Sequence, residues 1–194
     1  MSKKGLIFII SGPSGVGKGT VLAKLLEDPS FNICFNTSIT TRKPRDNEID
    51  GIHYIFVSKE DFLHKIRNNL FLEWTEYSNN YYGTSEADVR TLINNGKSVV
   101  LEIETKGMSQ ILSKYSKEFK IVTIFFLPPS LETLKSRLVN RQTNTTADIE
   151  NRLKRANDEI KASSNYNYKI VIDNTESAYS KLHDIVEKET TKYE

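Results

Sequence analysis

The chain has 194 residues, of which 38% are hydrophobic and 27% charged, and its formal net charge at pH 7 is +2. This length is enough for one domain with a full hydrophobic core, and the composition is that of an ordinary globular protein. A charge this small does not support binding to nucleic acid or to a membrane by bulk electrostatics. We therefore expect neither partner, and any functional positive charge must be concentrated locally.

Cysteine usage and the N-terminus bear on the compartment. The lone Cys34 excludes an internal disulfide, which fits a reducing cytosol, and its place in the apolar run Phe31–Phe35 favours a buried structural thiol. Lys3 and Lys4 precede an apolar stretch that ends after Ile10, which is too short for a secretion signal or a membrane span. We expect a cytoplasmic protein.

The first predicted element is a strand at Leu6–Ile10, an unbroken apolar run of the kind buried on both faces of a parallel sheet. A helical pattern follows at Thr20–Leu26. The loop between them is rich in glycine, so that backbone N–H groups can turn toward phosphate oxygens, while the helix dipole favours an anion and Lys18 supplies a point charge. The predicted nucleotide-binding residues of this loop are Gly12, Pro13, Ser14, Gly15, Val16, Gly17, Lys18, Gly19 and Thr20.

The loop departs from the usual pattern at one position. Gly19 follows Lys18 directly, where such loops have a Ser or Thr that contacts magnesium, and Thr20 comes one residue later. This Gly-Lys-Gly-Thr form resembles the loop of adenylate kinases. Mg²⁺ is then expected to be held mainly through the nucleotide and water, because it gives up its water shell reluctantly.

Residues 36–96 predict a small mixed insertion over one edge of the parallel sheet. Ile52–Val57 alternates like a half-exposed strand, and Ser58–Asp61 opens a short helix with a capping pattern. Phe71–Tyr77 is predicted as a second strand, rich in aromatic residues. Ser85–Asp88 caps a further helix, which Gly96 terminates.

The insertion also carries a set of residues suited to a small anionic acceptor. Arg42 and Arg45 flank Pro44, and Tyr54 and Tyr82 follow along the chain. Two arginine forks and two tyrosine hydroxyls suit a phosphate dianion, and the carboxylate of Glu73 can accept from adjacent ring N–H groups. Each feature alone is an ordinary surface feature, but together, downstream of a phosphate loop, they predict an acceptor site.

The remaining chain returns to strand–helix alternation. Apolar runs at Ser98–Ile103, Ile121–Leu127 and Lys169–Ile172 predict three more buried strands. Helices are predicted around Leu131, Leu134 and Leu138, along Ile149, Leu153, Ala156 and Ile160, and from Ser180 to Lys192. This order predicts an α/β fold, with a doubly wound parallel sheet of about five strands.

The predicted strand Ser98–Ile103 leads to two acids at its end. Glu102 and Glu104 are expected to face the same way because they lie two apart on a strand. Acids at this strand end resemble the Walker-B position, where one organises magnesium or contacts the acceptor.

The whole pattern resembles the guanylate kinases over roughly residues 4 to 187. The segments Thr-Thr-Arg-x-Pro-Arg, Asp-Gly-x-x-Tyr, Glu-Trp and Tyr-Tyr-Gly-Thr stand here in that family's order. The resemblance implies transfer of the γ-phosphoryl group of ATP to GMP, with Mg²⁺ as cofactor and dGMP as a further candidate acceptor. It assigns Arg42, Arg45, Tyr54 and Tyr82 to the GMP phosphate, and Ser38, Glu73, Thr84 and Glu104 to the rest of the GMP site. The family more often has Asp-Ile-Asp where this chain has Glu-Ile-Glu.

The resemblance also divides the chain. It implies one domain with a core of residues 1–35, 97–140 and 150–194, a GMP-binding insertion of 36–96 and a lid of 141–149. Arg141 and Arg152 match the arginines of the family's lid, and we favour a catalytic role for both because positive charge must gather around the transferring phosphoryl group. Arg137 is a further catalytic candidate, and Arg155 is interpreted as a surface residue. Asn174 matches the adenine-side loop.

Three alternatives stay open. They are a kinase of the same fold with another small acceptor, a non-catalytic module that binds phosphopeptides, and a P-loop switch GTPase. The intact loop with Lys18 disfavours the second, and the Glu73 pocket disfavours the third. His53, His64 and His183 have no triad or metal spacing, and a phosphate acceptor needs no general base. A monomer and a homodimer are both compatible with the sequence.

Overall fold

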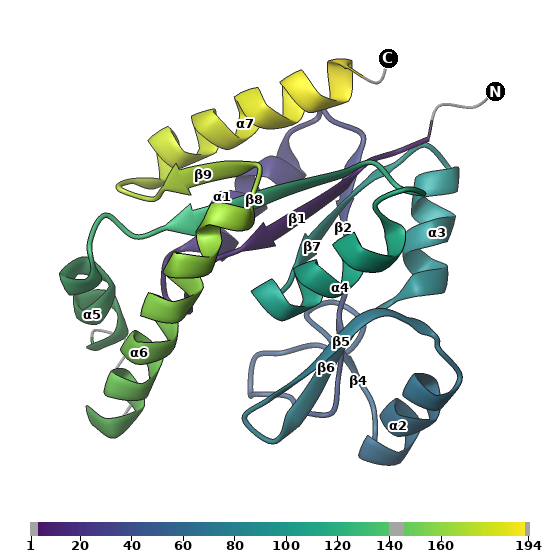
Figure 1. The fold of residues 1–194 in the computed structure, drawn as a ribbon, viewed down its shortest axis with the longest axis horizontal. Coiled ribbons are helices and arrows are strands. Elements are labelled where there is room, and N and C mark those ends of the chain that lie inside the picture. Colours follow the sequence, from purple (N-terminus) through teal and green to yellow (C-terminus); the bar gives the residue numbers. More distant parts are fainter. Residues whose placement is uncertain (1–3, 140–145, 193–194) are drawn as a thin grey trace. The chain divides into compact units, whose positions relative to one another are not determined.

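The computed structural model describes residues 4–139 and 146–192. The chain forms two compact units (Figure 1), one made of Met1–Phe8 and Asn32–Ile121 and the other of Ile9–Phe31 and Val122–Glu194. A five-stranded sheet has the order β2-β7-β1-β8-β9. Its strands are β1 (Ile7–Ser11), β2 (Ile33–Phe35), β7 (Ser98–Glu102), β8 (Ile121–Leu127) and β9 (Tyr168–Val171). β2 pairs with β7 and β8 with β9, both in parallel, so the predicted α/β sheet is confirmed.

The first unit contains a second, four-stranded sheet in the order β4-β3-β6-β5. Its strands are β3 (Ile39–Thr40), β4 (Ile55–Phe56), β5 (Phe71–Tyr77) and β6 (Asn80–Ser85). β3 and β4 are parallel, whereas β6 runs antiparallel to both β3 and β5, so the sheet is mixed as predicted. Ser78 and Asn79 have φ angles of 49° and 62°, which fit a two-residue hairpin turn between β5 and β6.

Three helices accompany these strands: α2 (Lys59–Arg67), α3 (Glu86–Asn94) and α4 (Thr105–Tyr115). The predicted caps are confirmed, because Ser58 accepts the N–H of Asp61 at 3.0 Å and Ser85 that of Asp88 at 3.4 Å. Phe62 of α2 stacks on Phe71 with ring centroids 4.4 Å apart, which anchors that helix to the small sheet.

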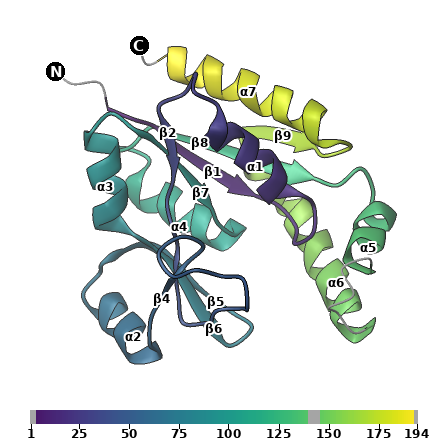
Figure 2. The ribbon, with the colours of Figure 1, turned by 180° about the vertical axis from the view of Figure 1, so that it is seen from behind.

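The second unit holds α1 (Lys18–Glu27), α5 (Leu131–Val139), α6 (Thr146–Ala162), a short 3-10 turn at Ser163–Asn165 and α7 (Thr175–Thr191). α1 and α7 pack side by side (Figure 2), where Lys24 pairs with Glu176 and Tyr179 donates to Asp28. α5 packs on α6 through the buried Leu134, Leu138 and Ala156.

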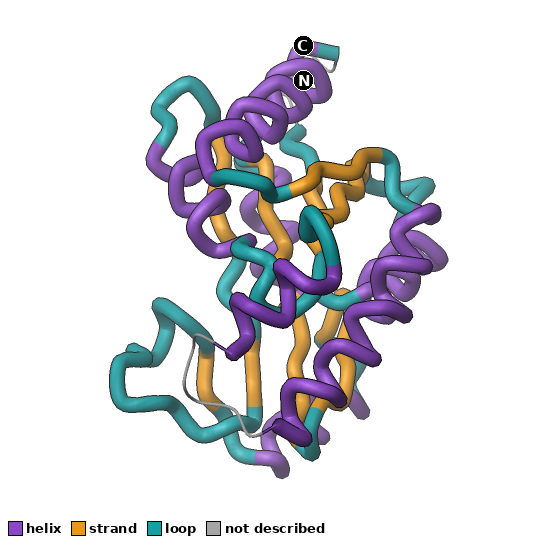
Figure 3. Tube along the Cα trace, turned by 90° about the vertical axis from the view of Figure 1, so that its left-hand side faces the viewer, coloured by secondary structure: helices purple, strands orange, loops and turns teal. Residues whose placement is uncertain are grey.

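Some predicted elements differ from the structure, whose helices, strands and loops Figure 3 separates by colour. The predicted strand Ile52–Val57 is reduced to Ile55–Phe56, because residues 49–54 form a turn in which Gly51 donates to the carbonyl of Tyr54 at 2.8 Å. Glu104 was expected to share a strand face with Glu102, but it lies outside the strand because β7 ends at Glu102. β2, β3, β6 and α4 were not predicted as elements.

Cys34 is half-buried rather than buried, and its thiol lies 3.6 Å from the carbonyl oxygen of Ser98. Desolvation raises the pKa of this thiol, which disfavours the reactive thiolate and agrees with a structural role. In the part of the chain that the structure describes, no helix is both long and apolar enough to span a membrane.

Candidate active site

The phosphate loop in the second unit is shaped by its glycines. Gly15 and Gly17 have φ angles of 88° and 108°, a region that other residues adopt only with strain. A Cβ atom on Gly15 would lie 2.8 Å from Cδ2 of Leu138, so the loop is also closely packed there. Gly17 is the N-cap of α1, and a glycine has no side chain with which to cap this helix end. The N-terminus of such a helix is suited to binding an anion through its first N–H groups.

Lys18 lies at the centre of this loop. Its Nζ donates to the carbonyl oxygens of Gly12 at 2.6 Å and Pro13 at 3.3 Å, so the ammonium group is held over the loop. Ser14, Gly19 and Thr20 are exposed, whereas Pro13 and Val16 are buried. The loop thus combines one partly buried cation with the N-terminus of α1.

Two of the predicted arginines lie against the loop. Arg137 donates to the carbonyl oxygen of Val16 at 2.7 Å and to that of Ile172 at 3.1 Å, so its two bonds are to backbone rather than to solvent. Nη1 of Arg152 lies 3.4 Å from Oγ of Ser14. Arg155, three residues later on α6, is exposed. Arg141 lies outside the described residues.

Asn174 follows β9 and serves as the N-cap of α7. Its side-chain oxygen accepts the N–H of Ser177 at 2.8 Å, so this oxygen has a structural partner. The predicted contact of Asn174 with the adenine side of ATP would have to use its amide group.

The predicted phosphate clamp assembles within the first unit. The guanidinium of Arg42 lies 5.3 Å from the ring centroid of Tyr54, and the rings of Tyr54 and Tyr82 are 6.1 Å apart. Burial raises the pKa of the Tyr54 hydroxyl, which keeps it neutral and able to donate to an anion. Arg45 is exposed at the turn that follows Arg42. The structure thus brings Arg42 together with the two phenols, whereas Arg45 is exposed three residues away.

Two of the predicted base-recognition residues, Glu73 and Thr84, lie on the neighbouring strands β5 and β6. Glu73 is only 3% exposed, and one of its oxygens, Oε1, accepts the hydroxyl of Thr84 at 2.7 Å. Glu73 and Thr84 are also directly opposite each other in the β5–β6 register. Burial raises the pKa of the Glu73 carboxyl to about 7, with the nearby Glu104 adding to the rise. Ser38 is half-buried immediately before β3.

A bulge accounts for the burial of Glu73. The register shifts between Phe71 and Glu73, so that Phe71, Leu72 and Glu73 are consecutive buried residues where a regular strand would alternate. Opposite the carboxylate, a Cβ atom on Gly107 would lie 2.4 Å from Oε2 of Glu73. The first turn of α4 therefore leaves room for the acid only because residue 107 is glycine.

Glu102, the last residue of β7, and Glu104, two residues later, have different surroundings, contrary to the expectation that they share a strand face. Glu102 is exposed at the end of β7, and its charge contributes to the raised pKa of Tyr54 in the phosphate clamp. Glu104 is the N-cap of α4 and acts on the pKa of Glu73 instead. The chain turns into the helix between them, which separates their neighbourhoods.

Sequence reasoning missed three contributors to this half-site. Glu48 pairs with Arg42 at 2.8 Å, Gly107 accommodates Glu73, and the Gln110 amide holds both backbone groups of Trp74, donating to its carbonyl at 2.8 Å. Only the pairing of Arg42 with a nearby acid in the same loop had a signal in the sequence, namely the short spacing between the two.

Within residues 4–139 and 146–192, no group of three or more His, Cys, Asp or Glu side chains could hold a metal ion. Two of the histidines have ordinary structural contacts: Nδ1 of His53 accepts the N–H of Ile49 at 3.0 Å, and the ring of His183 packs at a tilt against Phe31 with ring centroids 4.9 Å apart.

Comparisons with known proteins agree with this arrangement. The family model described as guanylate kinase matches residues 4–189. A guanylate kinase of Mycoplasmopsis pulmonis (strain UAB CTIP) is 42% identical over 186 residues, which are 95% of this chain and 95% of that protein. One of Bacillus subtilis (strain 168) is 42% identical over 194 residues, 100% of this chain and 94% of that protein. The crystal structure of guanylate kinase from Anaplasma phagocytophilum superposes with a TM-score of 0.78 at 31% sequence identity, covering 97% of this chain and 88% of that one.

Proposed function

The chain belongs to the guanylate kinase family, and we propose which of its residues carry the transfer of the γ-phosphoryl group from ATP to GMP. The observation that carries the proposal is the buried Glu73 carboxylate, paired with Thr84 in the same unit as an arginine–tyrosine clamp. Such a combination recognises a base and a phosphate of one nucleotide.

Guanine is selected by the Glu73 carboxylate. Guanine presents N1–H and the exocyclic N2 amine side by side, both donors, whereas adenine presents an acceptor at N1. An ionised carboxylate only accepts, so it takes both guanine donors but faces adenine with an unpaired buried charge. Ser38 and Thr84 complete the base edge with their hydroxyls, and Glu104 lies beside Glu73 to receive the N2 side.

The GMP phosphate is bound by Arg42, Arg45, Tyr54 and Tyr82. Arginine forks bind phosphate oxygens in pairs, and a neutral phenol donates one further hydrogen bond. The GMP phosphate is already a nucleophile as a dianion, so these residues need only hold and orient it.

ATP is bound by the loop of residues 12–20. Its backbone donors and the α1 N-terminus take the phosphate oxygens, and Lys18 neutralises charge that develops during transfer. Arg152 and Arg141 add positive charge at the transferring group, and Asn174 contacts the adenine side. For Arg137 the contacts with the carbonyls of Val16 and Ile172 support a role in bracing the loop.

Magnesium is the expected cofactor of this reaction, and the donor set of the chain fits it. Gly19 replaces the usual hydroxyl ligand, so Glu102 is the main protein candidate, with Glu104 second. Mg²⁺ is commonly bound through one or two carboxylates, substrate phosphates and water, so no dedicated cluster is required. When bound, the ion would supply positive charge that neutralises the phosphate oxygens during transfer.

The proposal includes the organisation of the chain. We assign residues 36–96 to GMP binding, 141–149 to a lid, and the rest to the core, with closure of these parts excluding the water that would hydrolyse ATP. We further propose a cytoplasmic enzyme, monomeric or homodimeric, that also accepts dGMP.

The test is a coupled ADP-release assay with ATP, Mg²⁺ and GMP, dGMP, AMP, CMP or UMP. We expect a preference for GMP over AMP of roughly 10⁴–10⁵ in kcat/KM, the range for sites built around hydrogen bonds to the substrate. Glu73→Gln should lower kcat/KM for GMP, while Glu76→Gln, which removes an exposed charge from the same strand, should not.

Comparable wild-type activity with AMP, or a Glu73→Gln enzyme equal to wild type with GMP, would overturn the assignment of Glu73. Activity with a sugar phosphate but not with GMP would favour a kinase of the same fold with another acceptor.

A further inference from the structure

Glu48 stands in the turn between Arg45 and the short strand β4, and both of its carboxylate oxygens are engaged. Oε1 accepts from Nη2 of Arg42 at 2.8 Å, and Oε2 accepts from the backbone N–H of Arg45 at 2.9 Å. The backbone N–H of Glu48 in turn donates to the carbonyl of Arg45 at 2.9 Å. One acid thus ties the guanidinium of the first clamp arginine to the backbone of the second.

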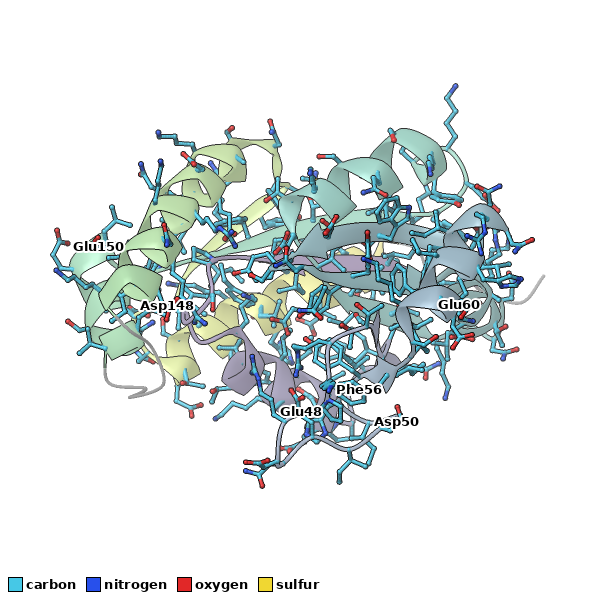
Figure 4. All side chains as sticks on the ribbon, turned by 90° about the horizontal axis from the view of Figure 1, so that it is seen from below. Glu48, Asp50, Phe56, Glu60, Asp148 and Glu150 are labelled. Atoms are coloured by element: carbon cyan, nitrogen blue, oxygen red, sulfur yellow. The ribbon has the colours of Figure 1, made fainter. Side chains whose placement is uncertain are left out.

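The guanidinium of Arg42 is held from other directions as well. Its Nη1 donates to the carbonyl of Lys43 at 2.8 Å, and its carbon lies 5.3 Å from the ring centroid of Tyr54 and 5.9 Å from that of Phe56. Figure 4 labels Glu48 and Phe56 on the part of the first unit that also carries Asp50. The side chains of Arg42 and Glu48 are only 16% and 15% exposed, so the pair is not an ordinary surface ion pair.

The surrounding turn is braced by further internal bonds. Oδ1 of Asp50 accepts the N–H of Phe56 at 2.9 Å, and Nδ1 of His53 accepts that of Ile49 at 3.0 Å. A turn with this many internal bonds moves little, so the position of Glu48 is defined by its backbone as well as by its partners.

The pairing leaves Arg42 able to bind a substrate. A guanidinium has five N–H donors, of which the bonds to Glu48 and Lys43 use one on each terminal nitrogen, and Tyr82 interacts with one more. The remaining two donors are enough for two bonds to a phosphate. Hydrogen bonding to Arg42 lowers the pKa of Glu48 to about 2, so the acid is ionised at neutral pH.

We propose that Glu48 is a positioning residue for the acceptor phosphate: it fixes the guanidinium plane of Arg42 and the backbone of Arg45 without touching the substrate. The inference rests on the proposed assignment of Arg42 to the GMP phosphate. Its effect is preorganisation, because a long, flexible arginine held in its binding orientation before GMP arrives loses less rotamer freedom on binding.

Glu48→Gln tests this with almost no change in shape. The glutamine has one acceptor oxygen, so its amide N–H₂ must face either Arg42 or the Arg45 N–H, donor against donor, and one contact is lost. We expect KM for GMP to rise about tenfold, with kcat and KM for ATP within about twofold of wild type, since preorganisation of one clamp affects one substrate. The matched control is Asp46→Asn, which removes the same charge from an exposed position of the same turn and should leave all three constants unchanged.

A double-mutant cycle separates this inference from the assignment on which it rests. Arg42→Lys should itself raise KM for GMP, because lysine cannot make a fork. Adding Glu48→Gln to Arg42→Lys should then raise KM for GMP much less than Glu48→Gln raises it in wild type, since both substitutions act through the Arg42 guanidinium. If Arg42→Lys leaves KM for GMP unchanged, the clamp assignment fails. If Arg42→Lys raises it but Glu48→Gln does not, the positioning role fails.

Two further results would overturn the inference. A lower KM for GMP in Glu48→Gln would mean that Glu48 competes with the phosphate for Arg42. Equal rises in KM for both substrates, with a lower thermal midpoint, would mean that the acid only stabilises the fold. Glu48→Asp keeps the charge with a shorter arm, so it should fall between wild type and Glu48→Gln if orientation is what matters.

Discussion

The two half-sites are built in different ways. The phosphate loop of the second unit is made almost entirely of backbone from residues 12–20, with Lys18 as its one cation. The acceptor half-site of the first unit is made of side chains that come from separate strands and turns between residues 38 and 107. A backbone site needs glycines and a helix end, whereas a side-chain site needs many pairwise contacts to be satisfied at once.

Helix capping bears on both half-sites. Ser58, Ser85 and Asn174 cap α2, α3 and α7 with their side chains, whereas among the described helices α1 and α4 begin without a side-chain bond from their N-cap residues, Gly17 and Glu104. The start of α1 lies at the phosphate loop, and the first turn of α4 lies against the buried Glu73. Burial of an ionised carboxylate is costly, so Glu73 is the expensive group of the acceptor half-site.

The largest expected effect on turnover concerns Arg152, which lies against the phosphate loop. Arg152→Ala should lower kcat about 10³-fold, the lower end of the range for arginine fingers, because Arg141 is expected to share the load. KM for GMP should change little. Arg155→Ala on the same helix is the control, since Arg155 is exposed. The measurement is steady-state kinetics of both variants. A loss of kcat below about tenfold in Arg152→Ala would make Arg152 a surface arginine.

Lys18→Ala should lower kcat by roughly 10²–10³ or more while the thermal midpoint stays near that of wild type. Its ammonium group is only partly buried and donates to the carbonyls of Gly12 and Pro13, so we expect the fold to depend on it little. Lys24→Ala on the same helix should retain activity. Near-normal turnover in a folded Lys18→Ala enzyme would contradict the assignment of the loop.

The buried Glu73 of the acceptor half-site should lower the stability of the folded protein. The folded-state pKa of Glu73 is raised to about 7 from 4.5, so between these values the folded protein holds a proton that the unfolded chain has lost. The contribution of this group to stability therefore falls as pH rises through that window. Glu73→Gln should be more stable than wild type by about 3 kcal/mol at pH 8 and by much less at pH 5, as measured by urea unfolding.

Binding of GMP should depend on the same proton of Glu73. Guanine requires the ionised carboxylate, so below pH 7 a proton must leave Glu73 before GMP binds. KM for GMP in wild type should rise about tenfold per pH unit below 7, relative to Glu73→Gln, in which the GMP phosphate titrates but residue 73 does not. A ratio of the two KM values that is constant from pH 5.5 to 8 would show that Glu73 does not contact the base.

The smallest effect concerns Thr75, two residues beyond Glu73 on β5. Its hydroxyl is buried, and the described residues provide no hydrogen-bond partner for it. Thr75→Val removes the hydroxyl without changing the shape, so it should stabilise the protein by about 1 kcal/mol. Thr40→Val is the contrast, because that hydroxyl donates to the carbonyl of Tyr81 at 2.9 Å and its loss should destabilise. Destabilisation by Thr75→Val would show that a bound water or ligand satisfies the group.

Local patterns predicted much of the fold. The apolar runs at β1, β7, β8 and β9, the amphipathic helix α6 and the serine caps of α2 and α3 all stand close to their predicted places. These elements depend on residues that are close together in the sequence. The signals are the spacing of apolar residues, the turn residues and the capping side chains. The short strands β3 and β6 escaped prediction because they are defined by their partners rather than by a period of their own.

The sequence by itself determined the class of the fold, because strand and helix patterns depend on neighbouring residues, and short motifs predicted the phosphate loop and the acceptor-site residues. Only the tertiary structure decided how those residues are placed. The bulge that buries Glu73, the glycine at 107 that makes room for it, and the turn that separates Glu102 from Glu104 all depend on contacts between elements. The pairing of Arg42 with Glu48 is decided in the same way, since which acid meets which arginine depends on the path of the loop and not on spacing alone.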